Sequence, residues 1–282
     1  MSDPRPIIRD LGVGAGVGTM SGALGIGGGI ALVPYLVLRR GIAQKRAQAT
    51  SLVMVGLAAG AGAITYGLRG QVAWLPALAI LAGGLIGSAT GSHLVQRTAD
   101  RWLQALFGLL LITAGIRMLW PTPDVIDSSM DLPALQPAII ALYVGTGFGM
   151  GLLSAMFGIG GGILLVPILV AFLHYTPQLA AGTSLAVMLP IALFGAYRQT
   201  KPGLTDWRQG SIFGLGSIVG AVIGASLAMA ASAAVVRWCF AIVLVAVGTR
   251  FIMSNWRALT SRPSSPGASS DQASPDQVER SS

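Results

Sequence analysis

Two glycine runs and two Thr-Ser pairs are the groups in this sequence whose types and spacing suggest chemistry. Consecutive glycines interrupt a helix, and a helix that restarts after them presents free N–H groups and the positive end of its dipole. Such N–H groups, together with neutral hydroxyl donors, suit a small anion. The predicted substrate-binding residues are therefore Gly25, Gly27, Gly28, Gly29, Thr50, Ser51, Gly158, Gly160, Gly161, Gly162, Thr183 and Ser184.

Each of these groups also has a structural interpretation. Glycine lets helices pack closely, and Ser or Thr caps a helix or bonds a carbonyl one turn back. Both interpretations stay open for the runs and the Thr-Ser pairs. The glycines spaced four apart favour packing alone: Gly14 and Gly18, Gly147 and Gly151, Gly83, Gly87 and Gly91, and Gly216, Gly220 and Gly224.

Nucleotide binding, metal binding and catalysis are not indicated by these motifs. Ile30 and Ile163 occupy the last glycine position of GxGxxG, and no Gly-Lys-Ser/Thr follows either run. His93 and His174 have no second His, Cys or carboxylate at ligand spacing, and no Ser-His-Asp set or HExxH motif occurs. We therefore predict no enzyme activity, no catalytic residue, no cofactor and no metal. Cys239, the only cysteine, is predicted to be a packed small residue.

The composition is that of an integral membrane protein. The chain is 53% hydrophobic and 10% charged, whereas a soluble domain carries about 25% charged residues. Its net charge of +8 comes from bases in short gaps between apolar runs. That placement is typical of cytoplasmic loops rather than of a nucleic-acid-binding surface, so the predicted partners are a small anion and the lipid bilayer.

Apolar stretches must position these groups, and they differ in length. Six stretches each suit one spanning helix of ~20 residues: 49–66, 74–95, 102–120, 180–197, 211–231 and 236–254. The other two, 7–38 and 136–173, contain the glycine runs and are too long for one crossing. We expect each to be a helical hairpin whose second arm, at 30–38 or 163–173, is too short to span the membrane.

The chain is an internal duplication. After a shift of 133 residues, Gly25–Ile30 falls on Gly158–Ile163, and Thr50-Ser51 falls on Thr183-Ser184. The predicted units are a first repeat (1–122), an acidic external linker (123–135), a second repeat (136–258) and a Ser- and Pro-rich, disordered cytoplasmic tail (259–282).

The loops indicate that the two repeats have opposite orientations. The loop at 39–46 is strongly basic, whereas its counterpart at 173–179 contains no Lys or Arg. Three bases lie at 198–208, against one Arg in the counterpart at 67–71. Because basic loops remain in the cytoplasm, counterpart loops lie on opposite sides, and both termini are predicted to be cytoplasmic.

The paired Gly-Ile-Gly-Gly-Gly-Ile and Leu-Val-Pro elements, followed by Ala-Thr-Ser-Leu or Gly-Thr-Ser-Leu, resemble the TauE/SafE family of bacterial sulfite exporters. The resemblance extends to about residue 255. It implies a multi-pass transporter of the bacterial inner membrane. It also implies export of sulfite, sulfoacetate or related small anions.

The expected fold is all-α and polytopic, with two inverted-topology repeats, each a glycine-broken hairpin plus three transmembrane helices. The expected function is export of small anions by alternating access. Because an interior-negative potential drives an anion outward by ~2.3 kcal/mol per charge per 100 mV, an exporter needs no proton-coupling carboxylate. A non-transporting membrane scaffold and an anion uptake system are the alternatives, and the oligomeric state stays open.

Overall fold

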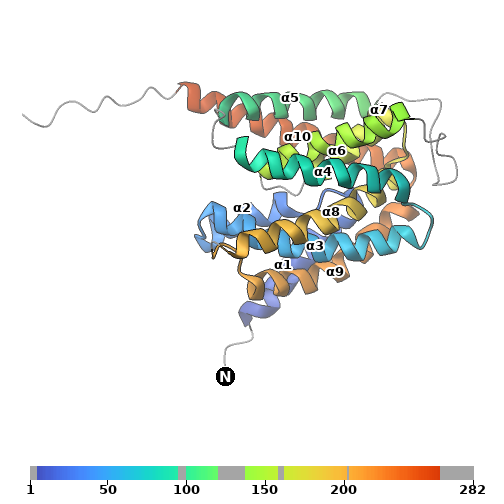
Figure 1. Cartoon of the computed structure of the whole chain (residues 1–282). Coiled ribbons are helices and arrows are strands. Elements are labelled where there is room, and N and C mark those ends of the chain that lie inside the picture. Colours follow the sequence, from blue (N-terminus) through green and yellow to red (C-terminus); the bar gives the residue numbers. More distant parts are fainter. Residues whose placement is uncertain (1–4, 95–99, 120–136, 158–161, 202, 261–282) are drawn as a thin grey trace, which may run out of the picture.

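The computed structural model describes residues 5–94, 100–119, 137–157, 162–201 and 203–260. All regular secondary structure within these residues is helical (Figure 1). One series of a long, a short and three long helices occurs twice. The first comprises α1 (Arg5–Leu24), α2 (Gly29–Arg40), α3 (Gln44–Gly67), α4 (Trp74–Leu94) and α5 (Asp100–Leu119). The second comprises α6 (Pro137–Phe157), α7 (Gly162–Leu173), α8 (Pro177–Thr200), α9 (Trp207–Ala230) and α10 (Ala233–Thr260).

The short helices α2 and α7 are the second arms expected after the glycine runs. Each has 12 residues, which at ~1.5 Å per residue gives a length of ~18 Å. A hydrocarbon core is ~30 Å thick, so neither helix crosses a membrane alone. The predicted linker at 123–135 lies outside the described residues, as does the predicted tail beyond residue 260.

The first apolar stretch turns back at its glycines, as the sequence predicts. Asp10, near the start of α1, forms an ion pair with Arg40, the last residue of α2. The start of α1 and the end of α2 therefore lie together, and the glycine run lies at the opposite end of the hairpin. Asp10 is only 5% exposed, so its pairing with Arg40 offsets the cost of burying a carboxylate.

A different contact closes the second hairpin. Tyr143, the repeat counterpart of Asp10, lies in α6, and its hydroxyl is 2.8 Å from the hydroxyl of Tyr175 just after α7. Burial, followed by the hydrogen bond and charge interaction with Tyr143, raises the pKa of the Tyr175 hydroxyl above its ordinary value. The first hairpin is thus closed by an ion pair, and the second hairpin is closed by a neutral hydrogen bond.

Glycines bring the first helix of each repeat against the third helix of the other. A Cβ on Gly14, Gly18 or Gly22 of α1 would overlap the backbone of Phe213, Ser217 or Ala221 of α9, in that order. The order shows that α1 and α9 run parallel. The same contacts recur between α6 and α4, which confirms the packing role predicted for nine of the ten glycines spaced four apart: Gly14, Gly18, Gly83, Gly87, Gly147, Gly151, Gly216, Gly220 and Gly224.

The equivalent helices α3 and α8 pack against each other in antiparallel fashion. Gly56 of α3 faces Leu193 of α8, and Gly62, further along α3, faces Leu185, earlier in α8. The equivalent helices α5 and α10 also pack in antiparallel order. Figure 1 shows α1, α3, α8 and α9 gathered below α4, α5, α6 and α10.

Three of the helices, α3, α8 and α9, are long and apolar enough to cross a membrane. Within the described residues α4 and α10 contribute shorter apolar segments, Trp74–Thr90 and Ala233–Thr249. Three of the six stretches predicted to span, 49–66, 180–197 and 211–231, thus lie in helices that are long and apolar enough to do so. Large apolar side chains cover the outer surface of these helices, including Leu78, Leu215 and Ile242, each more than half exposed, as a lipid-facing surface requires.

The prediction that Cys239 is a packed small residue is wrong. It is exposed on α10 rather than packed inside the protein. The apolar run around it covers the outer surface of the helix, where Trp238 and Ile242 are also exposed, so apolar neighbours in the sequence do not imply burial in a membrane protein.

Candidate functional site

The break between α1 and α2 is a buried, unwound segment that requires glycine. Gly25, Gly27 and Gly28 have φ values of +64°, +80° and +65°, a left-handed region that other residues rarely adopt. Ser21 O accepts the N–H of Gly25 at 2.7 Å and ends α1, and Gly28 O accepts the N–H of Leu32 at 3.1 Å and begins α2. These residues and Ile26 are all buried.

Backbone donors collect inside this break. The hydrogen bonds formed among the described residues include none from the N–H groups of Ile26, Gly27 and Gly28. The first turn of α2 follows directly, so the positive end of its dipole points to the same buried place. An anion is the ligand that such donors bind without a charged side chain.

Ser21 adds a hydroxyl to these donors. Its side chain is fully buried, and its Oγ has no hydrogen-bond partner among the described residues. It lies beside the break, because a Cβ on Gly28 would be 3.4 Å from the Cβ of Ser21. A buried hydroxyl left unpaired costs about 1–3 kcal/mol, which a bound ligand would recover.

Ser21 is not among the binding residues predicted from the sequence, although the repeat contains a signal for it. The shift of 133 residues places Ser154 opposite Ser21, so both repeats carry a serine just before the glycine run. The side chain of Ser154 lies outside the described part of the chain. A search of the repeat for matched polar residues inside apolar runs finds this pair.

The start of α7, which follows the second glycine run, lies against the first glycine break. A Cβ on Gly162, the first residue of α7, would lie 2.6 Å from the carbonyl oxygen of Gly25 and 3.1 Å from the Cα of Ile26. Ser184 of α8 donates to the same carbonyl oxygen of Gly25 at 2.9 Å. The structure thus brings Gly25, Gly162 and Ser184 together, as predicted, while Gly158, Gly160 and Gly161 lie outside the described residues.

Met188 fills the space between the breaks and was not expected from the sequence. A Cβ on Gly27 would overlap its terminal methyl group, and a Cβ on Gly162 would overlap its sulfur. The hydroxyl of Ser184 lies 3.8 Å from the same sulfur. Because methionine is unbranched and flexible, this side chain can leave the space between the breaks without displacing backbone.

The two threonines hold helices of the opposite repeat. The hydroxyl of Thr50 accepts the N–H of Asp206, the residue before α9, at 3.2 Å. The hydroxyl of Thr183 accepts the N–H of Ala73, the residue before α4, at 3.0 Å. Ser51 donates to Gln48 O within its own helix at 2.8 Å. These contacts give the three hydroxyls structural partners, and their role in substrate binding stays a prediction.

Within the described part of the chain, no cluster of three or more His, Cys, Asp or Glu side chains could hold a metal ion. The break offers backbone N–H groups and neutral hydroxyls instead. That arrangement can bind and release an anion.

Helices long and apolar enough to cross a membrane, with a glycine break buried among them, are typical of the class of helical membrane transporters. The chain belongs to the Sulfite exporter TauE/SafE family, whose profile matches residues 2–118 and 143–278.

Relatives of the chain carry names of the same class. A "Probable membrane transporter protein" of Xylella fastidiosa (strain 9a5c) is 30% identical over 258 residues, which cover 90% of this chain and 98% of that protein. The "Probable membrane transporter protein YunE" of Bacillus subtilis (strain 168) is 23% identical over 255 residues, 83% of this chain and 93% of that protein. No solved structure gives a significant match.

Proposed function

We propose that the protein exports small anions, such as sulfite or a small sulfonate, across the bacterial inner membrane by alternating access. The observation that carries the proposal is the set of unpaired donors in the α1–α2 break. Ser21 Oγ and the N–H groups of Ile26, Gly27 and Gly28 share one buried place, and none has a partner among the described residues. The Sulfite exporter TauE/SafE family supports the substrate class.

The charges in the described residues favour an anion over a cation. Asp10 is buried but already paired with Arg40. Asp206 caps the start of α9, where its carboxylate accepts the N–H of Gln209. Asp10 thus already has a cationic partner, and Asp206 lies at an exposed helix start rather than in the buried break. An anion moving outward down the membrane potential needs no proton relay.

Helix directions support two inverted repeats. If α3 and α8 both cross the membrane, their antiparallel packing gives equivalent helices opposite directions. Exchanging the two repeats also converts the parallel pair α1–α9 into the parallel pair α6–α4. Inverted repeats that meet at paired breaks are the arrangement in which one repeat rocks against the other around a fixed site. Both termini would then be cytoplasmic.

Replacement of Ser21 by Ala tests the proposal. The change removes one hydroxyl donor and keeps the Cβ, and a hydrogen bond to a charged group is worth about 1.5–3 kcal/mol. We expect efflux of sulfite from cells to fall about tenfold or more, with expression unchanged. Ser217→Ala is the matched control, because Ser217 is equally buried but its hydroxyl has partners, Gly214 O at 2.7 Å in its own helix and Met54 O of α3 at 3.4 Å.

Wild-type efflux by Ser21→Ala would reject the site. A protein that moves none of sulfite, a small sulfonate and a small carboxylate would favour the membrane scaffold instead. Net accumulation of the anion inside cells would favour uptake.

A further inference from the structure

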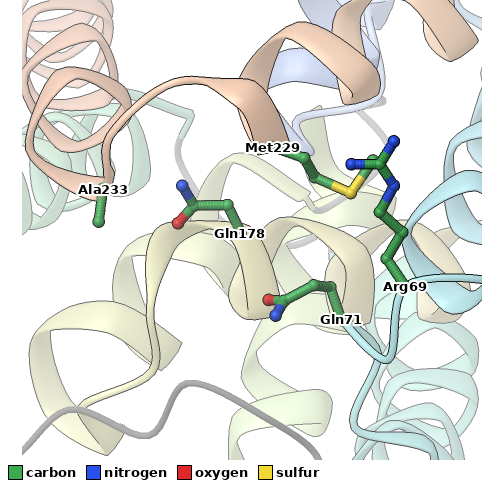
Figure 2. A pocket seen from close by; sticks show the side chains of 5 residues that line it. All are labelled: Arg69, Gln71, Gln178, Met229 and Ala233. Atoms are coloured by element: carbon green, nitrogen blue, oxygen red, sulfur yellow. The ribbon is translucent and has the colours of Figure 1, made fainter.

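A second polar site lies away from the glycine breaks, where three connections between helices, α3–α4, α7–α8 and α9–α10, meet at one end of the bundle. A cavity of about 340 Å³ is lined by Arg69, Gln71, Gln178, Met229 and Ala233. Figure 2 shows Arg69 beside Met229, with Gln178 across from them. These residues come from the α3–α4 loop, the first turn of α8, the end of α9 and the start of α10, which the charge pattern of the loops assigns to the external face.

Arg69 makes the cavity positive. The side chain is exposed to the cavity and forms no ion pair with a carboxylate of the described residues. A guanidinium binds carboxylate, sulfonate or sulfite oxygens through several N–H groups at once. The charged part of the ligand is therefore an oxyanion.

Gln178 supplies a hydrogen-bond acceptor, whereas Arg69 supplies donors. Its Nε2 donates to the carbonyl oxygens of Ala228 and Ala231, at 3.3 and 3.4 Å. Because only the NH₂ can bond two carbonyls, these contacts fix which way the amide points. Its Oε1 is buried and accepts no hydrogen bond from the described residues. A ligand in the cavity, which Gln178 lines, therefore lies next to a side chain with an unused acceptor, which an oxyanion alone leaves unsatisfied.

We propose that this cavity is an exit site for a small oxyanion that carries its own hydroxyl, bound through Arg69 and through Gln178 Oε1. A hydroxyl donor fits better than an ammonium group, since a second positive charge would share the cavity with the guanidinium. This inference rests on the proposed function for the direction of transport, whereas the binding is measured separately.

The duplication makes this site specific to one end of the molecule. The repeat counterpart of Gln178 is Lys45, and that of Arg69 is Pro202. The equivalent positions in the sequence therefore do not pair a guanidinium with an amide acceptor, and the exit site discriminates among ligands that the duplicated breaks bind alike.

Calorimetry on the purified full-length protein in lipid nanodiscs tests the proposal, with 2-hydroxyethanesulfonate and ethanesulfonate as probes. We expect the wild type to bind the hydroxylated sulfonate about tenfold more tightly, because the other probe leaves Oε1 unpaired. Arg69→Gln should weaken both probes about tenfold. Arg208→Gln, which changes an exposed arginine at the start of α9, should alter neither.

Gln178→Lys is the decisive variant. It keeps donors for the two carbonyls but has no acceptor, so the ratio of the two affinities should fall to about one. Gln178→Leu should give the same ratio if the lysine variant is unstable. Equal binding of both probes by the wild type, or a preference that survives both changes, overturns the proposal. If either of these contrary binding results is found but efflux is normal, the proposed function stands. If binding is as expected but no efflux occurs, only the proposed function is rejected.

Discussion

At the scale of single residues, the breaks combine unpaired donors with one adaptable side chain. Ser21 and the N–H groups beside it are ready to donate, but Met188 occupies the space between Gly27 and Gly162. A ligand that binds there has to displace a flexible thioether rather than backbone. Under the proposed function, Met188 is the residue that would set how large an anion can pass.

Met188→Ala should widen the space between the breaks. We expect the flux of a large sulfonate relative to sulfite to rise severalfold, while the free energy of unfolding falls by about 2–5 kcal/mol, as for other buried methionines. Thermal unfolding and a competition flux assay measure the two effects. Met118→Ala is the matched control, because Met118 is equally buried but lies on α5. An unchanged ratio of large-sulfonate flux to sulfite flux in Met188→Ala would show that Met188 does not limit the size of the anion.

The hydrogen-bond partners of the hydroxyl groups could not be predicted from the sequence. The spacing of the Thr-Ser pairs correctly places Ser184 beside the first break. It does not reveal that Thr50 bonds the N–H of a residue 156 positions away. A repeat identifies equivalent residues, whereas their partners depend on which helices pack together, so Ser21 and Met188 emerge only from the burial and contacts in the folded protein.

At the scale of the helices, the bundle depends on glycine-mediated packing repeated in two places. The breaks and the short arms follow directly from the lengths of the apolar stretches and the glycine runs. The pairing of α1 with α9 and of α4 with α6 does not, because several helices carry glycines at the same spacing and sequence alone does not match them.

Gly18→Ala tests the packing of α1 on α9. The added Cβ would overlap the carbonyl oxygen of Ser217, so the helices must separate at a cost of about 1–3 kcal/mol. We expect the Tm to fall by several degrees. Gly16→Ala is the control, since its Cβ would meet nothing within 4 Å, and its Tm should stay the same or rise slightly. Equal effects of the two changes would contradict the packing.

At the scale of the whole molecule, the proposed inverted orientation of the two repeats predicts that equivalent loops lie on opposite sides of the membrane. In a Cys239→Ser background, Ala43→Cys lies between α2 and α3, and His174→Cys lies between α7 and α8; both positions are exposed. A membrane-impermeant maleimide added to spheroplasts should label position 174 and spare position 43 until the membrane is opened. Labelling of both positions, or of 43 alone, in sealed spheroplasts would exclude the proposed topology.

The differences between the repeats are as informative as their similarity. The first hairpin is closed by Asp10 and Arg40, the second by Tyr143 and Tyr175, and the residues equivalent to Gln178 and Arg69 are Lys45 and Pro202. The two ends of the duplicated bundle therefore differ. This asymmetry suits a transporter that releases its anion to one side.

The central claim is that an anion leaves through the breaks, driven by the membrane potential without a proton relay. Sulfite flux from oriented proteoliposomes, measured under imposed potentials with and without a pH gradient, tests it most directly. Outward flux should increase as the interior becomes more negative, ignore the pH gradient at constant anion charge, and fall about tenfold in Ser21→Ala. Flux that follows the pH gradient but not the potential, or that Ser21→Ala leaves unchanged, would contradict the claim.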